Sequence, residues 1–189
     1  MALNWAMLSP DRTPVPLPNE LTITSVASGV ECILRIPDAP PAADATSGGS
    51  GGSKTLKAVG RVEVTDMRFI FTSATDATFE SLSVPLPSIL TSNFHQPTFG
   101  SNYLSFELKP APDGGLTVGT SAEIRFQNAP MFSFVAILEK TRERAIYMKR
   151  QEAENVEGLP LYTAPDEGGS TSSAGVRTVP ADAPPGYDA

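Results

Sequence analysis

Residues 116–150 read LTVGTSAEIRFQNAPMFSFVAILEKTRERAIYMKR, and the spacing of apolar residues changes within them. Towards Phe126 apolar and polar residues alternate, which places Ile124 and Phe126 on one face, as in a β-strand. After Pro130, which suits the first position of a helix, large apolar residues recur at helical spacing. We therefore expect a strand followed by an amphipathic helix that ends near Arg150.

Stretches with strand patterns precede this segment. In residues 30–36, Val30, Cys32, Leu34 and Ile36 fall on one face, which is the period-2 pattern of a strand. Asp113-Gly114-Gly115 is a turn signal before the last strand. Several antiparallel strands followed by one helix predict an α+β domain at residues 1–150, in which the helix caps the open end of a curled antiparallel sheet. The other expected strands lie at 57–64, 67–71, 79–84 and 104–109.

Two segments lack the residues that a packed core needs. Residues 37–53 are rich in Pro, Ala, Gly and Ser, so we expect a flexible loop inserted into the domain. Residues 151–189 have few large apolar side chains, and their burial cannot offset the entropy lost on ordering. We expect a disordered tail there.

The net charge of −7 is unevenly distributed. Residues 1–150 carry 13 Lys and Arg against 14 Asp and Glu, whereas residues 151–189 carry one against seven. An acidic tail is repelled by phosphate backbones, so we expect no nucleic-acid partner. The chain shows no signal-peptide pattern and no run of about 18 apolar residues. These features predict a soluble intracellular protein, and we expect it in the cytoplasm and also in the nucleus.

The residues that carry most enzyme chemistry are scarce. His95 is the only histidine and Cys32 the only cysteine, so neither an intramolecular disulfide nor a cysteine-based zinc site can form. His95 has no partner nearby in sequence and is expected in a loop, and Cys32 is expected to be a small buried hydrophobic residue. We therefore expect a protein that is not an enzyme, without catalytic residues, cofactor or metal.

A short basic cluster offers one binding hypothesis. Lys54, Lys57, Arg61 and Arg68 could bind the headgroup of an anionic membrane lipid such as a phosphoinositide. They could equally be the polar positions of alternating strands, because Glu63 lies among them. Weak peripheral lipid binding is therefore the alternative function.

The strongest functional signal lies near the end of the chain. Pro184-Pro185-Gly186-Tyr187 has the form Pro-Pro-x-Tyr. Consecutive prolines favour the polyproline II helix, whose exposed rings fit the aromatic groove of a WW domain, while the tyrosine enters a neighbouring pocket. Pro184, Pro185 and Tyr187 therefore predict WW-domain binding. Leu159, Pro160 and Tyr162 form a Leu-Pro-x-Tyr variant that is a second candidate.

The domain also resembles a known family, the WW domain-binding protein 2 family, and is most similar to fungal-type members. The Pro-Pro-x-Tyr motif matches the family's ligand motif residue for residue. The resemblance covers most of residues 1–150 and is carried by Leu3-Asn4-Trp5, by residues 60–65, 68–71 and 79–86, by Gln96-Pro97-Thr98-Phe99-Gly100-Ser101-Asn102-Tyr103-Leu104, and by Gly114-Gly115.

This resemblance implies a GRAM domain, a PH-like fold in which a partly open barrel carries a C-terminal helix. It also implies an adaptor whose WW-domain partners include HECT-type ubiquitin ligases and transcriptional co-activators. The chain departs from the family in two respects. Its tail has one full motif where relatives often have several, and the insertion at 37–53 lengthens a loop of the domain.

Overall fold

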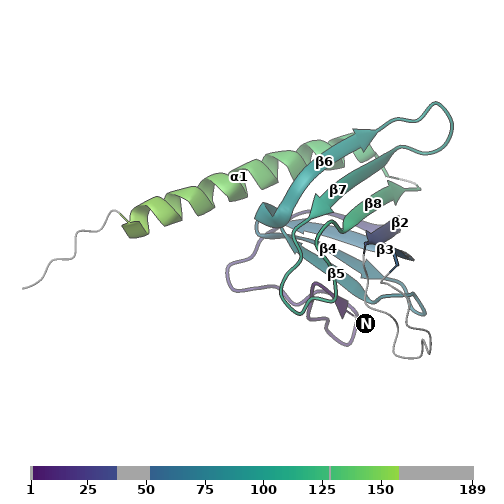
Figure 1. Cartoon of the computed structure of the whole chain (residues 1–189), viewed down its shortest axis with the longest axis horizontal. Helices are drawn as coiled ribbons and strands as arrows, with labels where there is room; N and C mark the ends of the chain where they lie inside the picture. The colour runs from purple at the N-terminus through teal and green to yellow at the C-terminus, as the bar shows by residue number, and fades with distance from the viewer. Residues whose placement is uncertain (1, 38–51, 128, 158–189) are drawn as a thin grey trace, which may run out of the picture. The chain divides into compact units, whose positions relative to one another are not determined.

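The structure is a computed structural model that describes residues 2–37, 52–127 and 129–157. Its strands curl around one core, and the helix α1 lies along one side and extends past the end of the sheet (Figure 1). The elements are β1 Ala2–Leu3, β2 Thr22–Ile36, β3 Lys54–Thr65, β4 Arg68–Ser73, β5 Ser81–Pro85, the 3-10 turn η1 Leu86–Ser88, β6 Ile89–His95, β7 Tyr103–Leu108, β8 Ser121–Phe126 and α1 Met131–Glu157.

The strands form one sheet in the order β1-β5-β4-β3-β2-β8-β7-β6. Neighbours from β5 to β6 in this order are antiparallel, and β1 pairs with β5 in parallel. The sheet curls into a half-barrel that one helix caps, which confirms the predicted fold class.

The inner faces of the strands meet in an apolar core. Phe69 and Phe106, from opposite halves of the sheet, pack edge to face with ring centroids 5.2 Å apart. Phe134 of α1 packs in the same way on Phe126, at 4.9 Å. Met131, Val135 and Leu138 of α1 are also buried. The first turns of α1 are thus held by burial of apolar surface.

β2 connects the two halves of the sheet because it is long and bent. Its pairing with β3 extends from Thr22 to Ile36, whereas β8 pairs only with residues 30–35. The register with β3 shifts between Thr22 and Thr24 and again between Val26 and Val30. Gly29 has a φ of 72°, which glycine adopts readily. Bulges bend a strand in this way and re-aim its side chains.

Asn4 fastens the start of the chain to two distant segments. Its side-chain amide donates to the Ser83 carbonyl of β5, and its Oδ1 accepts from the Ala111 N–H at 2.7 Å. The Asn4 N–H donates to the Gly114 carbonyl at 2.6 Å. Asn4 therefore joins β5 to the turn before β8, whose prediction from Asp113-Gly114-Gly115 is confirmed.

Several elements differ from the sequence-based predictions. α1 continues to Glu157 instead of ending near Arg150, because residues 151–154 are good helix formers and the first glycine comes at 158. β2 begins eight residues before the predicted strand, and β6 had no prediction at all. β6 has an irregular exposure pattern that lacks strict alternation, so periodicity could not indicate it.

The predicted flexible loop at 37–53 and the predicted disordered tail at 151–189 lie mostly outside the described residues. Both stay predictions there. Residues 151–157 are the exception, because they belong to α1.

Candidate functional site

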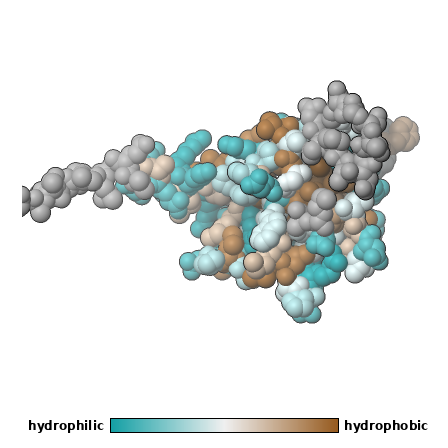
Figure 2. All heavy atoms as spheres, turned by 60° about the horizontal axis from the view of Figure 1, so that its bottom comes forward, coloured by the Kyte–Doolittle hydropathy of each residue, from teal (hydrophilic) through white to brown (hydrophobic). Residues whose placement is uncertain are grey.

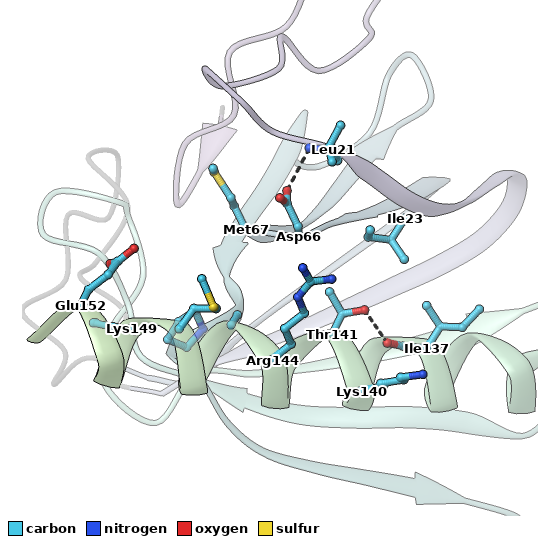
Figure 3. Close-up of a pocket in the computed structure, with 13 residues that line it drawn as sticks. Leu21, Ile23, Asp66, Met67, Ile137, Lys140, Thr141, Arg144, Lys149 and Glu152 are labelled. Carbon is cyan, nitrogen blue, oxygen red and sulfur yellow. Dashed lines mark hydrogen bonds between the residues drawn. The ribbon is translucent and has the colours of Figure 1, made fainter. Parts of the chain in front are cut away.

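A groove of about 820 Å³ separates residues 137–152 of α1 from the end of the sheet. One wall is a face of α1, and the other consists of the start of β2 and the turn between β3 and β4 (Figure 3). The side chains that line it are mainly apolar, with charged groups at the edges.

The helical wall follows from the spacing of apolar residues in α1. Ile137, Thr141, Ala145 and Met148 line the groove at successive steps of three or four residues. Thr141 presents its methyl group while its Oγ1 donates to the Ile137 carbonyl at 2.7 Å, as Figure 3 shows. This row of residues continues into the core at its Ile137 end, whereas Met148 at its other end is 47% exposed.

The opposite wall is built from two backbone features. At the first irregularity of β2, Ile23 has no partner residue in β3, and its side chain lines the groove. Leu21, directly before β2, is paired with Asp66 in the β3–β4 turn. The Leu21 N–H donates to Asp66 Oδ1 at 2.9 Å, and the Asp66 N–H donates to the Leu21 carbonyl at 3.0 Å. This pair of bonds holds Leu21 and Met67 beside the groove, where Leu21 is 66% exposed.

The charges at the groove differ between its two walls. Lys140, Arg144 and Lys149 lie along α1, and in the part of the chain that the structure describes no carboxylate forms an ion pair with them. Asp66 lies on the opposite wall and Glu152 near the end of the helical wall. Figure 3 shows the Arg144 side chain directed from α1 towards the wall that carries Asp66.

A buried ion pair fixes the segment that precedes β2. Glu20 accepts two hydrogen bonds from Arg68, at 2.7 and 2.9 Å, one from Thr65 Oγ1 at 2.8 Å and one from the Leu17 N–H at 2.6 Å. The side chains of Arg68 and Glu20 are 9% and 2% exposed. Burial alone raises the pKa of the Glu20 carboxyl, but the hydrogen bonds, led by Arg68, outweigh it and hold this pKa below its usual value.

The four residues of the predicted lipid site do not converge. Lys54 is exposed at the start of β3, Lys57 pairs with Glu31 at 2.7 Å, and Arg68 is buried beneath residues 15–20. Lys54 begins β3, whereas Arg68 begins β4 beside the far end of β3, a separation on the order of 30 Å for a strand of this length.

Arg61, the fourth residue, is also engaged by its neighbours. Its Nη2 donates to the Arg12 carbonyl, and its Nε lies 4.0 Å from a carboxylate oxygen of Glu63. The four residues of the predicted lipid site therefore mainly occupy polar positions of strands, which is the second interpretation that the sequence allowed.

The remaining residues that the sequence singled out are now placed. The prediction that His95 lies in a loop is wrong, because His95 is the last residue of β6. Its ring stacks on Tyr103 with ring centroids 4.5 Å apart, and its Nε2 lies 2.8 Å from Ser105 Oγ. Cys32 is buried, as predicted, and burial raises the pKa of its thiol. The WW-binding candidates 159–162 and 184–187 lie outside the described residues.

Sequence reasoning missed the groove itself. Its helical wall had a signal, because Thr141, Ala145 and Met148 extend the apolar spacing beyond Leu138. The sheet wall had none, since Ile23 reaches the groove only through an irregularity in β2 pairing.

Metal-binding clusters and membrane-spanning helices are two further features to consider in the described residues. Within residues 2–37, 52–127 and 129–157, no group of three or more His, Cys, Asp or Glu side chains could hold a metal ion. None of the helices in these ranges has the length and apolar character needed to cross a membrane.

Comparison with known proteins supports the fold more than the function. No protein-family model matches the chain. A stretch of 104 residues, 54% of this chain, is 25% identical to the UPF0664 stress-induced protein of Schizosaccharomyces pombe, and it covers 60% of that protein's length. The N-terminal PH domain of Vps36 superposes with a TM-score of 0.54 and 14% identity, which covers 77% of this chain and 96% of that domain.

The chain is therefore a PH-like domain protein, because the superposition covers 96% of a solved PH domain and 77% of this chain. Its similarity to the Schizosaccharomyces pombe protein indicates distant homology. At these identities the likeness to the solved structure shows the fold alone.

Proposed function

We propose that this protein is a non-enzymatic adaptor that binds WW domains through Pro184, Pro185 and Tyr187. The observation that carries the proposal is the sequence Pro184-Pro185-Gly186-Tyr187, which lies 27 residues beyond the end of α1. A PH-like domain joined to such a motif suits a protein that brings two partners together.

The physical basis is the low entropic cost of docking a proline-rich segment. Each proline ring fixes its own φ, so the segment loses little conformational freedom when it enters an aromatic groove. Tyr187 then supplies apolar area and a hydroxyl for a neighbouring pocket. A contact of this size supports a Kd on the order of micromolar.

The test is WW-domain binding by the full chain, measured by isothermal titration calorimetry with a single WW domain of a HECT-type ubiquitin ligase. Tyr187→Ala should weaken binding at least about 10-fold, because an aromatic anchor is lost. Tyr147→Ala is the matched control, since Tyr147 is an exposed tyrosine of α1 outside the motif. Unchanged affinity after Tyr187→Ala together with Tyr162→Ala contradicts the proposal.

The second motif extends the same proposal. Leu159, Pro160 and Tyr162 lie about 25 residues before Tyr187, a spacing with a coil reach of about 25–30 Å. Two motifs on one chain would engage a tandem pair of WW domains with higher avidity. Tyr162→Ala should then weaken binding to a tandem WW protein and leave binding to a single WW domain nearly unchanged.

The same proposal includes kinship with the WW domain-binding protein 2 family, partners among HECT-type ubiquitin ligases and transcriptional co-activators, and a cytoplasmic and nuclear location. Support comes from the resemblance that covers most of residues 1–150, from the terminal motif and from the PH-like fold. Binding of anionic lipid stays the alternative prediction. It gains nothing from Lys57, Arg61 and Arg68, since each of them already contacts a carboxylate.

A further inference from the structure

We propose that the groove between α1 and the start of β2 binds an amphipathic helical segment of a partner protein, with acidic residues on the flank that faces α1. This surface belongs to the folded domain, so the inference is independent of the WW-binding motif.

Apolar side chains on both walls of the groove are left uncovered. Leu21, Ile23 and Met67 face the groove from the sheet side and are 66%, 45% and 38% exposed. Met148 faces it from α1 at 47%. Figure 2 shows that one face of the molecule carries separate hydrophobic patches among hydrophilic residues. The groove differs from a flat patch because its two apolar walls form one concave surface, which is typical of a binding site.

The groove is long enough to hold a short helix. From Ile137 to Met148 the helical wall extends over 11 residues, or about 16 Å at the rise of an α-helix. A partner helix of about three turns places apolar residues at i, i+3 or i+4, and i+7 along such a length. The volume of about 820 Å³ suits a row of side chains entering between the walls.

The positive charges along the helical wall complement an acidic segment. Lys140, Arg144 and Lys149 follow the helical wall without an ion pair among the described residues, whereas Lys57, Arg68 and Arg125 of the sheet each pair with a glutamate. Unpaired cations beside an apolar groove attract acidic side chains and fix the orientation of the bound segment.

The acidic groups at the groove favour a peptide over a membrane. Asp66 on the sheet wall and Glu152 on α1 would repel the anionic headgroups that the three cations attract. A peptide can carry charges of both signs, so one flank meets Lys140 and Arg144 while a basic residue meets Asp66. The mixed charge therefore selects a partner of defined pattern.

The test begins with a library of displayed 16-residue peptides selected on the immobilised full chain. We expect enriched peptides to have apolar residues at i, i+3 or i+4, and i+7, with Asp or Glu on one flank. The most enriched peptide is then synthesised and its Kd is measured by fluorescence anisotropy. The double variant Leu21→Gln with Met148→Gln should weaken binding at least about 10-fold, because both side chains are exposed and lose only their apolar contact.

Two controls separate the groove from general effects. Phe99→Gln removes a 92% exposed apolar side chain outside the groove and should leave the Kd unchanged. Lys140→Glu with Arg144→Glu should weaken the acidic peptide at least 10-fold, and a peptide with Lys in place of its acids should bind this variant better than the original chain. Tyr187→Ala should have no effect, so this proposal and the WW-binding proposal fail separately.

Each other result overturns the inference. Failure to enrich any peptide, enrichment of peptides without the acidic flank, or binding that survives Leu21→Gln with Met148→Gln removes it. Binding of phosphatidylserine vesicles that this double variant abolishes assigns the groove to a membrane. Dissociation of a dimer by the same variant in sedimentation assigns it to a second copy. Peptides that bind only a chain ending at Glu157 assign it to residues 158–189.

Discussion

Glu20 explains why Arg68 is not available to bind a lipid headgroup. Arg68 has the appearance of a headgroup ligand in the sequence, yet Glu20 accepts two hydrogen bonds from it below the surface. Arg68 also donates to the Val15 carbonyl at 2.8 Å. The pair thereby holds the segment before β2 against the β3–β4 turn, next to the sheet wall of the groove.

At this scale we predict that Glu20→Gln lowers the free energy of unfolding by about 3–5 kcal/mol, because it leaves the buried Arg68 charge without its carboxylate. Because folding lowers the pKa of Glu20, its contribution is complete above the ordinary value of 4.5 and is lost as pH falls through the folded-state pKa. Urea unfolding between pH 7 and pH 3 measures this, and the two proteins should converge at low pH.

The control for this prediction is Lys57→Gln. Lys57 pairs with Glu31, but its side chain is 59% exposed, so the loss should stay within about 1 kcal/mol. Equal losses for Glu20→Gln and Lys57→Gln, or a difference from the original chain that does not change with pH, would contradict the role assigned to the buried pair.

Among the elements, β3 and β4 leave no room between them for a side chain at Gly60. A Cβ there would lie 2.0 Å from the Thr72 carbonyl oxygen and 2.7 Å from Ser73 Cα, both of them backbone atoms that cannot rotate away. Gly60 lies opposite Ser73 in the register, next to the bend of β2 at Val30. The missing side chain therefore allows the sheet to curl.

Gly60→Ala should accordingly destabilise the protein by about 2 kcal/mol or more, since the strands must separate to admit a methyl group. Gly52→Ala serves as the matched control, because a Cβ at Gly52 meets nothing within 4 Å. Thermal unfolding followed by circular dichroism compares the two. A melting temperature for Gly60→Ala as high as that for Gly52→Ala would refute the proposed close approach.

The strands and the helix also differ in how well the sequence predicts them. Strands with strict alternation, such as Tyr103–Leu108, and the start of α1 at Met131 were predicted because one face of each is buried in the core. β6 and the first half of β2 were missed because they are partly exposed on both faces. The groove was missed because it depends on an irregular register at Ile23 and on Glu20 and Arg68 meeting across 48 residues.

For the whole molecule, the two proposed binding functions reside in different parts of the chain. The groove depends on α1, β2 and the β3–β4 turn being folded together, whereas the WW-binding motif is a short linear sequence that lies outside the described residues. Unfolding of the domain should therefore abolish binding at the groove and leave WW-domain binding intact.

This separation predicts the behaviour of a chain with both Glu20→Gln and Gly60→Ala. At a temperature where circular dichroism shows this chain unfolded and the original chain folded, its affinity for a WW domain should change less than about twofold, because a linear motif needs no folded support. The groove-binding peptide should bind only the original chain. A parallel loss of both affinities would show that WW binding needs the folded domain.

The position of Asn4 has a consequence for the order in which the chain folds. Its Oδ1 bonds a residue 107 positions away, and its amide bonds one 79 positions away. Such distant contacts close large loops at a high entropic cost and tend to form late. During synthesis, Asn4 cannot bond the turn at residues 111–114 until that turn has left the ribosome, so until then β1 covers the edge of β5 without these bonds.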